Sequence, residues 1–339
     1  MTSPSSTLRL GILGAARIAR QFTAAVRSSP RIHVQAVASR DVARAQALAT
    51  ETGIPQVHAT YEALLADPAI DAIYNPLPNN LHAEWAIRAA EAGKHVLCEK
   101  PLAASASEAR AMFAAARRHD VYLVEAYPYR AQPQTLKMRE LIGAGAIGRV
   151  HVVQAFFGFQ LSDPTNIRLN PALAGGALMD AGSYPVSLVR TVMDERPARV
   201  HAIARWAESG VDRTVTATIE FASGALAQIG CSFATSRHRG AFIGGELGSI
   251  ETTYANDTSA DQPGQLLLKR QAGKDTVRET IETATAGGFL AEAESFHDLI
   301  LRGWKGWTGA TPEESIDIAL TMEAIAASAR QGIAVDLAS

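Results

Sequence analysis

The first part of the chain alternates between short apolar runs and stretches with helical spacing. Apolar runs of this kind are typical of strands that are buried on both faces of a parallel sheet. They predict strands at 8–13, 32–38, 70–75, 96–98 and 121–125. Between them, apolar residues recur at helical spacing, for example at 41–51, 83–92 and 105–119. Repeated alternation of strand and helix predicts an α/β fold with a doubly wound parallel sheet, the Rossmann arrangement.

After Arg149 the pattern changes to successive long strands. The clearest is 213–221, in which Val215, Ala217 and Ile219 alternate with polar residues. Such alternation indicates a strand with one face in the core, and strands joined by short turns indicate an antiparallel sheet with helices on one face. We expect the threonine-rich face to be solvated or to form a subunit interface. Other strands are predicted at 150–159, 199–207, 225–233, 240–244, 249–254, 264–270 and 276–282, and helices at 187–193 and 313–330.

The length of the chain and this change of pattern together predict two domains. A chain of 339 residues is long for a single domain. We expect a Rossmann domain at 1–127, followed by an α+β domain with a mainly antiparallel sheet at 128–339.

Composition narrows the possible classes of protein. The formal net charge is −2, which gives no indication of a nucleic-acid partner. No apolar run is long enough to span a bilayer, and residues 1–7 lack the basic start and apolar stretch of a signal peptide. Cys98 and Cys231 lie far apart in apolar runs, as expected of buried thiols. These features predict a soluble cytoplasmic protein, and no histidine has the spacing of a zinc motif.

The turn after the first predicted strand resembles a dinucleotide-binding fingerprint. The strand runs into Gly14-Ala15-Ala16-Arg17-Ile18-Ala19, and a helical pattern follows. Gly14 allows a tight turn, while the small side chains of Ala16 and Ala19 let the backbone approach a pyrophosphate and the helix pack on the strand. The N–H groups at the start of the helix would bind the phosphates. Because only one of the three fingerprint glycines is present, the turn alone is a weak signal.

The end of the second strand predicts which nicotinamide cofactor binds. Ser39 lies about 20 positions after Ala19, where the residue that contacts the cofactor ribose is expected. NAD-binding chains carry Asp or Glu there, whereas this chain carries Ser39 and Arg40. A guanidinium makes charge-assisted, bidentate contacts with phosphate oxygens, so the pair predicts a 2′-phosphate and hence NADP. Asp41, one position further on, keeps NAD possible.

Loop 76–82 follows another predicted strand, at the edge of the sheet where ligands bind in this class of fold. Its residues Pro78, Asn79 and His82 are candidates for binding the nicotinamide ribose. His82 has two interpretations, a general base or a histidine that is hydrogen-bonded to the loop backbone, and the second is preferred.

The stretch 93–101 ends a further buried strand with Glu99, Lys100 and Pro101. Pro101 restricts the backbone conformation of Lys100. The lysine amine is therefore carried by a rigid stretch of backbone at the carboxyl end of the strand. The alternative interpretation is a pair of solvated loop charges.

Segment 166–185 of the second half combines glycines with an acid, a phenol and a guanidinium. Asp180 and Tyr184 are four positions apart, so one helical face could carry both. Arg168 precedes them. The alternative interpretation is that Asp180 caps a helix and that Tyr184 is an amphipathic core residue.

Together these motifs resemble the Gfo/Idh/MocA oxidoreductases over nearly the whole chain, in order. The chain is most similar to the branch of NADP-dependent aldose (xylose-type) and dihydrodiol dehydrogenases. Two departures from the family pattern are the alanines at 16 and 19, and Tyr184 where many relatives have histidine. The motifs that carry the resemblance are 11–14, Pro78-Asn79-x-x-His82, 92–101, 175–184, and for the branch 38–41 and 125–130.

The resemblance implies hydride transfer between nicotinamide C4 and C1 of a cyclic aldose, giving a lactone, or of a related cyclic polyol. Lys100 and Tyr184 would flank the nicotinamide and share a proton relay. Asp180 would accept from a sugar hydroxyl and hold Lys100, and Arg168 would add a substrate contact. The ordinary pKa of a phenol is about 10, and a neighbouring ammonium favours the phenolate form.

The resemblance also implies features around these residues. Glu99 and Lys100 would contact the cofactor, and the Lys100–Pro101 peptide would be cis. The second domain would have an open-faced sheet through which the chain forms a homodimer, or part of a tetramer. The partner in the reaction would be a small carbohydrate.

Three other functions remain open from the sequence. One is an aldose–aldose oxidoreductase that keeps NADP bound, although several such enzymes carry a long N-terminal arm and only residues 1–7 precede the first strand here. A second is a glycoside hydrolase that works through transient oxidation. A third is a non-catalytic sensor of sugar or NADP. The presence of Lys100, Asp180 and Tyr184 together favours an enzyme.

Overall fold

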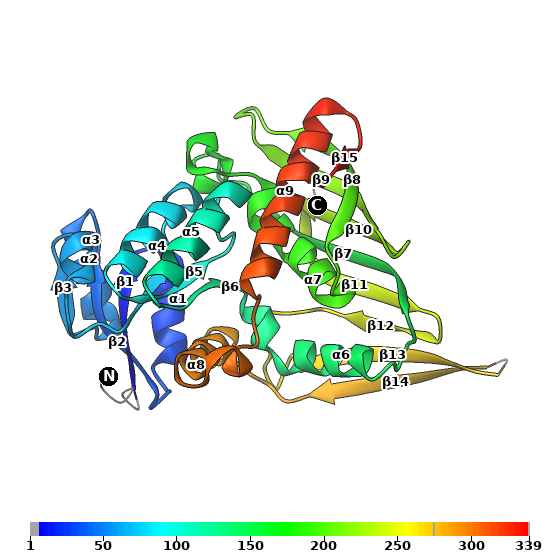
Figure 1. Cartoon of the computed structure of the whole chain (residues 1–339), viewed down its shortest axis with the longest axis horizontal. Coiled ribbons are helices and arrows are strands. Elements are labelled where there is room, and N and C mark those ends of the chain that lie inside the picture. Colours follow the sequence, from blue (N-terminus) through cyan, green and yellow to red (C-terminus); the bar gives the residue numbers. More distant parts are fainter. Residues whose placement is uncertain (1–6, 274, 338–339) are drawn as a thin grey trace. The chain divides into compact units, whose positions relative to one another are not determined.

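The computed structural model describes residues 7–273 and 275–337, which form two compact units (Figure 1). Residues 1–6, which make up most of the predicted polar start, lie outside the described residues. The first unit contains 7–103, 107–131 and 287–312, and the second contains 104–106, 132–286 and 313–337. The units therefore differ from the predicted division at 127/128, because segment 287–312 returns to the first unit.

The first unit is built on a six-stranded sheet in the order β3-β2-β1-β4-β5-β6. Every neighbouring pair in it is parallel. This order reverses beside β1, which is the topological switch point of a Rossmann fold. The prediction of a doubly wound parallel sheet is confirmed. The strands are β1 (Leu8–Leu13), β2 (Ile32–Ala38), β3 (Gln56–His58), β4 (Ala72–Asn75), β5 (His95–Glu99) and β6 (Leu123–Ala126).

Helices connect these strands close to the predicted positions. Helix α8, at a place where no helix was predicted, packs against α1 in the core of the first unit. Its residues Ala293, Phe296 and Leu299 are fully buried there, since their spacing places them on one helical face. This buried face is why 287–312 belongs with the first unit. The helices are α1 (Arg17–Val26), α2 (Val42–Thr52), α3 (Tyr61–Leu65), α4 (His82–Glu91), α5 (Ala106–Arg118) and α8 (Gly288–Arg302), with short 3-10 turns η1 (Asn79–Leu81), η2 (Pro128–Ala131) and η6 (Gly303–Gly306).

The second unit contains a nine-stranded sheet in the order β14-β13-β12-β11-β7-β10-β9-β8-β15. β7 and β10 run parallel, and the other neighbouring pairs of described strands are antiparallel. The prediction of a mainly antiparallel sheet is therefore confirmed. The strands are β7 (Val150–Gln160), β8 (Pro197–Trp206), β9 (Asp212–Phe221), β10 (Leu226–Ser232), β11 (Ala234–Gly245), β12 (Gly248–Thr252), β13 (Gly264–Ala272), β14 (Asp275–Thr283) and β15 (Val335–Asp336).

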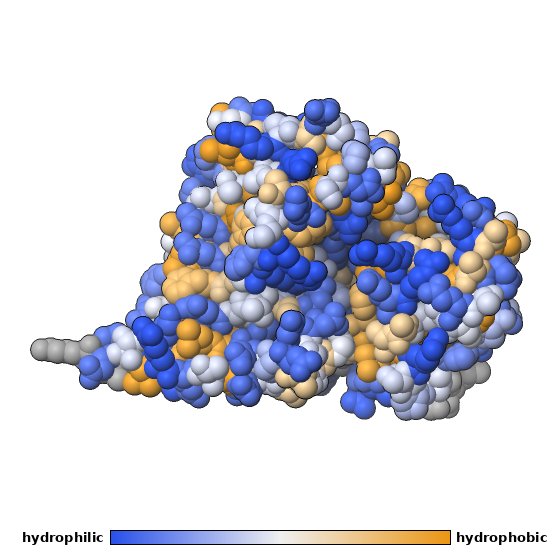
Figure 2. Space-filling model, turned by 180° about the vertical axis from the view of Figure 1, so that it is seen from behind, coloured by the Kyte–Doolittle hydropathy of each residue, from blue (hydrophilic) through white to orange (hydrophobic). Residues whose placement is uncertain are grey.

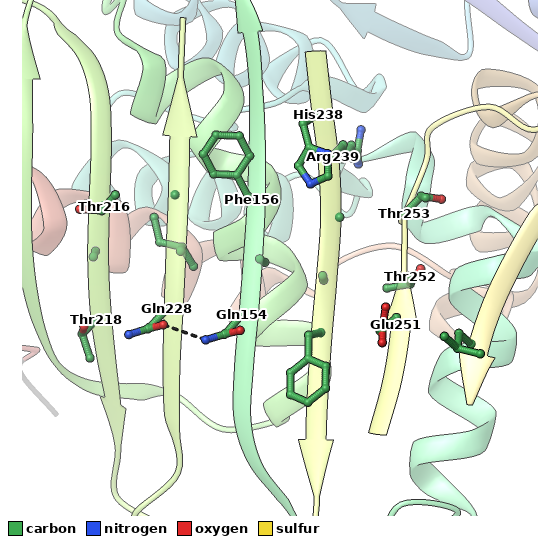
Figure 3. A pocket seen from close by; sticks show the side chains of 18 of the residues that line it. Gln154, Phe156, Thr216, Thr218, Gln228, His238, Arg239, Glu251, Thr252 and Thr253 are labelled. Atoms are coloured by element: carbon green, nitrogen blue, oxygen red, sulfur yellow. Dashed lines mark hydrogen bonds between the residues drawn. The ribbon is translucent and has the colours of Figure 1, made fainter. Parts of the chain in front are cut away.

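Helices cover one face of this sheet and leave the other open. Along β9, Val215, Ala217 and Ile219 are buried, while Thr216 and Thr218 line a broad depression of about 970 Å³ on the open face (Figure 3). The alternation predicted for this strand is confirmed. The helical elements are α6 (Pro133–Gly143), α7 (Ser183–Met193) and α9 (Pro312–Gln331), with short helices η3 (Ile167–Leu169), η4 (Pro171–Leu173) and η5 (Leu178–Gly182).

Cys98 and Cys231 are buried free thiols, as predicted. In the part of the chain that the structure describes, no helix has both the length and the apolar character needed to cross a bilayer. On the face drawn in Figure 2, hydrophilic and hydrophobic residues are interspersed, which is the usual composition of a protein surface.

Candidate functional site

The turn between β1 and α1 has the geometry of a phosphate-binding turn. Gly14 adopts a φ of 88°, which favours glycine, and its N–H donates to the carbonyl of Ala38 at 2.6 Å. Helix α1 starts at Arg17, and its N-cap residue Ala16 provides no side-chain acceptor. The first N–H groups of the helix are therefore left for another acceptor, and an anion is the natural one. Of the predicted phosphate-binding residues, 14–16 lie in this turn and 17 and 18 form the start of α1.

The three residues after β2 differ in how they are used. Asp41 caps α2, where its carboxylate accepts the N–H of Arg44 at 3.3 Å. The Ser39 hydroxyl is buried and accepts the N–H of Asp41 at 3.3 Å. Arg40 is exposed and forms no ion pair with the described residues. Because Asp41 is engaged as a cap and Arg40 keeps its guanidinium available, this corner fits a 2′-phosphate better than a bare ribose.

His82 joins the two loops that follow β4 and β5. It is 1% exposed, and its Nδ1 and Nε2 lie 2.9 Å from the carbonyl of Pro101 and 2.7 Å from that of Leu77. Burial lowers the pKa of the imidazole. Both ring nitrogens of His82 face backbone carbonyls, and the cofactor contact predicted for this residue stays a prediction. The preferred interpretation, a loop-bonding histidine, agrees with this geometry.

The loop residues beside His82 remain candidates for the cofactor. Pro78 and Asn79 are half-buried at the start of η1, so part of each side chain stays accessible.

The end of β5 holds Lys100 on a well-supported loop. The Lys100–Pro101 peptide is cis, as the resemblance implied. Glu99 is 8% exposed and accepts the hydroxyl of Tyr74 at 2.6 Å. Pro101 is buried, whereas Lys100 is only half-buried. The backbone is thus anchored on both sides of an amine that solvent can reach.

A second carboxyl group, Glu292 of α8, lies near Glu99. Glu292 is 1% exposed, and neither of its oxygens has a hydrogen-bond partner among the described residues. Burial raises the pKa of Glu292 well above its ordinary value, and the negative charge of Glu99 raises it further. Both effects favour the uncharged form of Glu292 in the folded protein. The sequence does contain a signal for it, since Glu292 lies within the apolar stripe of α8.

In the second unit, Arg168 and Asp180 form an ion pair, with Arg168 Nε 2.6 Å from Asp180 Oδ2. Burial disfavours the guanidinium charge, but the carboxylate outweighs this effect and raises the pKa of Arg168. The Arg168 carbonyl accepts the N–H of Gly176 at 2.8 Å. A Cβ on Gly175 would come within 2.5 Å of the same carbonyl oxygen, so the glycine pair is needed to fold this loop.

Asp180 lies on a short π-helix, η5, which leads into α7. The predicted helix at 187–193 was too short, because α7 already starts at Ser183 and carries Tyr184 in its first turn. Pro185 has no N–H to close the preceding turn as an α-helix, and a π-turn is a common form of such irregularity at functional sites. Asp212 fixes the start of η5 by accepting the N–H of Leu178 at 2.6 Å.

Tyr184 is 6% exposed and lies among aromatic and polar side chains of the same unit. Its ring meets Phe157 edge to face, with centroids 5.4 Å apart. Its oxygen accepts Asn256 Nδ2 at 3.0 Å, and the guanidinium of Arg239 lies 4.2 Å from the ring centroid. Arg239 and Asn256 were missed by sequence reasoning, because neither belongs to a recognisable motif.

The depression on the open face of the sheet lies mainly on the other side of the sheet from Tyr184. Phe156 lines the depression (Figure 3), whereas its neighbour Phe157 contacts Tyr184, and successive residues of a strand point to opposite faces. Arg239 belongs to both places, since it lines the depression and its guanidinium also lies against the Tyr184 ring.

Fold and site define a class of protein, a nicotinamide-dependent oxidoreductase, and comparison with known proteins identifies the family. The oxidoreductase family with an NAD-binding Rossmann fold matches residues 8–127, and the GFO/IDH/MocA C-terminal domain matches residues 135–251. The chain therefore belongs to the Gfo/Idh/MocA family. This confirms the predicted family, fold and enzyme class.

Individual relatives agree with this assignment. D-xylose 1-dehydrogenase (NADP(+)) 2 of Haloferax volcanii is 39% identical over 337 residues, covering 97% of this chain and 100% of the relative. Trans-1,2-dihydrobenzene-1,2-diol dehydrogenase of Danio rerio is 37% identical over 248 residues, covering 72% of this chain and 74% of the relative. An aldose-aldose oxidoreductase from Caulobacter crescentus, solved with glycerol, superposes with a TM-score of 0.87 at 27% identity, covering 98% of this chain and 100% of that one.

The buried carboxyl of Glu292 leads to a prediction about stability. The unfolded chain ionises this group above a pH of about 4.3, while the folded protein keeps it protonated because its pKa is raised. The stability contributed by Glu292 is therefore present below that pH and is lost as the pH rises through the folded pKa. Glu292→Gln removes the titration, so we expect its melting temperature at pH 8 to exceed that of the wild type by at least about 2 °C, the shift that 1 kcal/mol gives.

Thermal unfolding from pH 4 to pH 9 provides the measurement, and the difference should shrink toward pH 4. The matched control is Glu91→Gln on α4, where the side chain is exposed. Parallel curves for wild type and Glu292→Gln would contradict the prediction.

Proposed function

We propose that this protein is an NADP-dependent dehydrogenase that oxidises C1 of a cyclic aldose to a lactone. The observation that carries the proposal is the Tyr184 centre, where a phenol lies on the same helical segment as a carboxylate that is paired with a guanidinium. A phenol suits proton transfer from an alcohol, and a carboxylate–guanidinium pair suits the hydroxyls of a sugar. Relatives named for xylose and for a cyclic diol support the same substrate class.

The first unit would hold the cofactor. Its phosphates would bind to the N–H groups of residues 14–18, and a 2′-phosphate would bind to Ser39 and Arg40. Pro78, Asn79 and Glu99 would line the nicotinamide ribose. When bound, NADP+ accepts a hydride at nicotinamide C4.

The protein itself has to remove a proton. Oxidation of C1 releases a hydride from carbon and a proton from the attached hydroxyl, and we propose that Tyr184 accepts this proton and passes it to Lys100. Asp180 would accept from a neighbouring sugar hydroxyl while Arg168 fixes its orientation. That Asp180 also holds Lys100, as the resemblance implies, stays a prediction.

A second candidate is an aldose–aldose oxidoreductase that keeps its NADP between turnovers. The similarity to the Caulobacter crescentus enzyme favours it. The two candidates share their chemistry and differ in whether the nicotinamide dissociates, so denatured protein should release stoichiometric NADP only if the second is right.

The test of the proposal is reduction of NADP+ and NAD+, followed at 340 nm, across a panel of pentoses, hexoses and cyclic diols. We expect NADPH to form with at least one aldose, faster than NADH. If the absorbance at 340 nm does not change with any substrate, and the protein carries no bound nicotinamide, the proposed dehydrogenase activity is refuted.

Arg40→Ala tests the cofactor assignment. A hydrogen bond to a charged group contributes about 1.5–3 kcal/mol, so we expect the KM for NADP+ to rise about 10- to 100-fold while that for NAD+ changes little. Arg44→Ala is the matched control, since Arg44 is also exposed. Equal effects on both cofactors would count against a 2′-phosphate contact.

Tyr184→Phe and Lys100→Met test the proton relay. Because general acid–base catalysis contributes about 100- to 10,000-fold, we expect each variant to lose at least 100-fold in kcat and to retain the fold, as judged by circular dichroism. Full activity in either variant would remove that residue from the relay.

We further propose that the open face of the nine-stranded sheet pairs with the same face of a second copy. The depression there is lined mostly by uncharged residues, including Gln154 and Gln228, which hydrogen-bond to each other (Figure 3), and Ile203 is 60% exposed. Depletion of charge and exposed apolar area are typical of interface cores.

A charged residue at the centre of this face would be buried without a partner, at substantial cost. We therefore expect Thr216→Arg to convert a dimer into a monomer in light scattering, while Glu91→Arg on α4 leaves the mass unchanged. A wild-type monomer, or a Thr216→Arg dimer, would contradict the proposal.

A further inference from the structure

A chain of two hydrogen bonds connects Arg239 through Asn256 to Tyr184. Arg239 Nη1 donates to Asn256 Oδ1 at 3.0 Å, and Asn256 Nδ2 donates to the Tyr184 oxygen at 3.0 Å. The three residues come from different parts of the second unit: β11, the segment after β12, and α7. Only the tertiary structure brings them together.

The orientation of the Asn256 amide follows from chemistry. A guanidinium can only donate hydrogen bonds, so Asn256 has to turn its carbonyl oxygen toward Arg239. Its NH₂ group is then directed at Tyr184, and the phenol oxygen is an acceptor in this contact. The phenol proton therefore points away from Asn256, toward a different acceptor. The amide cannot flip without placing its own donors against those of Arg239.

Arg239 is held in place by aromatic rings. Its guanidinium lies 4.2 Å from the ring centroid of Tyr184, 4.4 Å from that of Tyr254 and 5.1 Å from that of Phe157. Cation–π contacts of this kind stabilise a positive charge where few water molecules reach it. Tyr254 is fully buried and donates its hydroxyl to the carbonyl of Phe156 at 2.7 Å, so the platform beneath Arg239 is rigid.

Asn256 is fixed independently of Arg239. Its backbone carbonyl accepts from the side chain of Gln132, which is itself fully buried. The amide that contacts Tyr184 is therefore positioned before any substrate binds, and pre-organised donors are the most effective means of stabilising a charge that develops during a reaction.

We propose that Arg239 and Asn256 are positioning residues that prepare Tyr184 to accept a proton. The permanent positive charge of Arg239 polarises the Asn256 amide, and the amide donates to the phenol oxygen, which favours negative charge on that oxygen and directs the hydroxyl proton away from Asn256, toward the next group of the relay. This inference rests on the proposed role of Tyr184 as proton acceptor. The other charged pair near the phenol is Arg168 with Asp180, and Tyr184 contributes to the raised pKa of Arg168.

Asn256→Asp provides the sharpest test, because it keeps the shape of the side chain but replaces the donor by an acceptor. We expect kcat at pH 7 to fall about 10- to 100-fold, the factor that corresponds to loss of a hydrogen bond to a charged group. The pH at which kcat reaches half its maximum should rise by about one unit or more, while the KM for NADP+ stays unchanged. Arg239→Met should shift the profile in the same direction, and Arg239→Lys, which keeps the charge, should restore part of it.

A second measurement does not depend on turnover. Phenolate absorbance can be followed during a pH titration of the whole protein, and the contribution of Tyr184 is the part that Tyr184→Phe removes. We expect this part to appear at higher pH in Asn256→Asp than in the wild type. Asn256→Leu, which removes the donor without adding a charge, should give a smaller shift in the same direction and covers the case in which Asn256→Asp does not fold.

The outcomes separate the inference from the proposed function. If the wild type oxidises no aldose, the proposed dehydrogenase activity is refuted. The absorbance titration still tests whether Arg239 and Asn256 act on Tyr184. If the wild type is active and the Asn256 and Arg239 variants keep its pH profile and its titration, the positioning role of the pair is refuted.

Discussion

Burial of the parallel sheet on both faces is the constraint on which the first unit depends. Because β1, β4 and β5 are covered on each side, no polar group can be placed along them without losing its hydration, and functional side chains have to stand at the carboxyl ends. Gly14, Glu99 and Lys100 are all found there. His82 connects the loops that follow β4 and β5, because its two ring nitrogens lie within hydrogen-bond distance of the carbonyls of Leu77 and Pro101.

The same constraint makes the buried carboxyl of Glu292 unusual. An ionised carboxylate without a partner is costly in a core, and this cost raises the pKa of Glu292. Its neighbour Glu99 has the hydroxyl of Tyr74 as a donor, so the two carboxyls face different environments. Pairs of titratable groups with diverging environments are typical of functional sites, and Glu99 of this pair directly precedes Lys100, the lysine that we assign to the proton relay.

The second unit differs from the first because helices cover only one face of its sheet. The covered face supports the Tyr184 centre through α7 and η5, and the open face is left for solvent or for a second copy. Charges on the covered side are compensated one by one: Asp180 by Arg168, Asp212 by the N–H of Leu178, and Arg239 by aromatic rings. Such compensation keeps a polar site stable in a place with little water.

The sequence by itself determined the fold class, the order of strands and helices, the family, and the candidate groups in local motifs such as Lys100, Asp180 and Tyr184. These follow from the periodicity of apolar residues and from short-range chemistry, which a linear pattern records. Only the tertiary structure decided that α8 belongs to the first unit, that His82 is engaged by backbone, and that Arg239 and Asn256 stand behind Tyr184. Most of those relations depend on contacts between residues far apart in the sequence, such as Asn256 and Tyr184, which are 72 positions apart, and no local pattern encodes which distant side chains will meet.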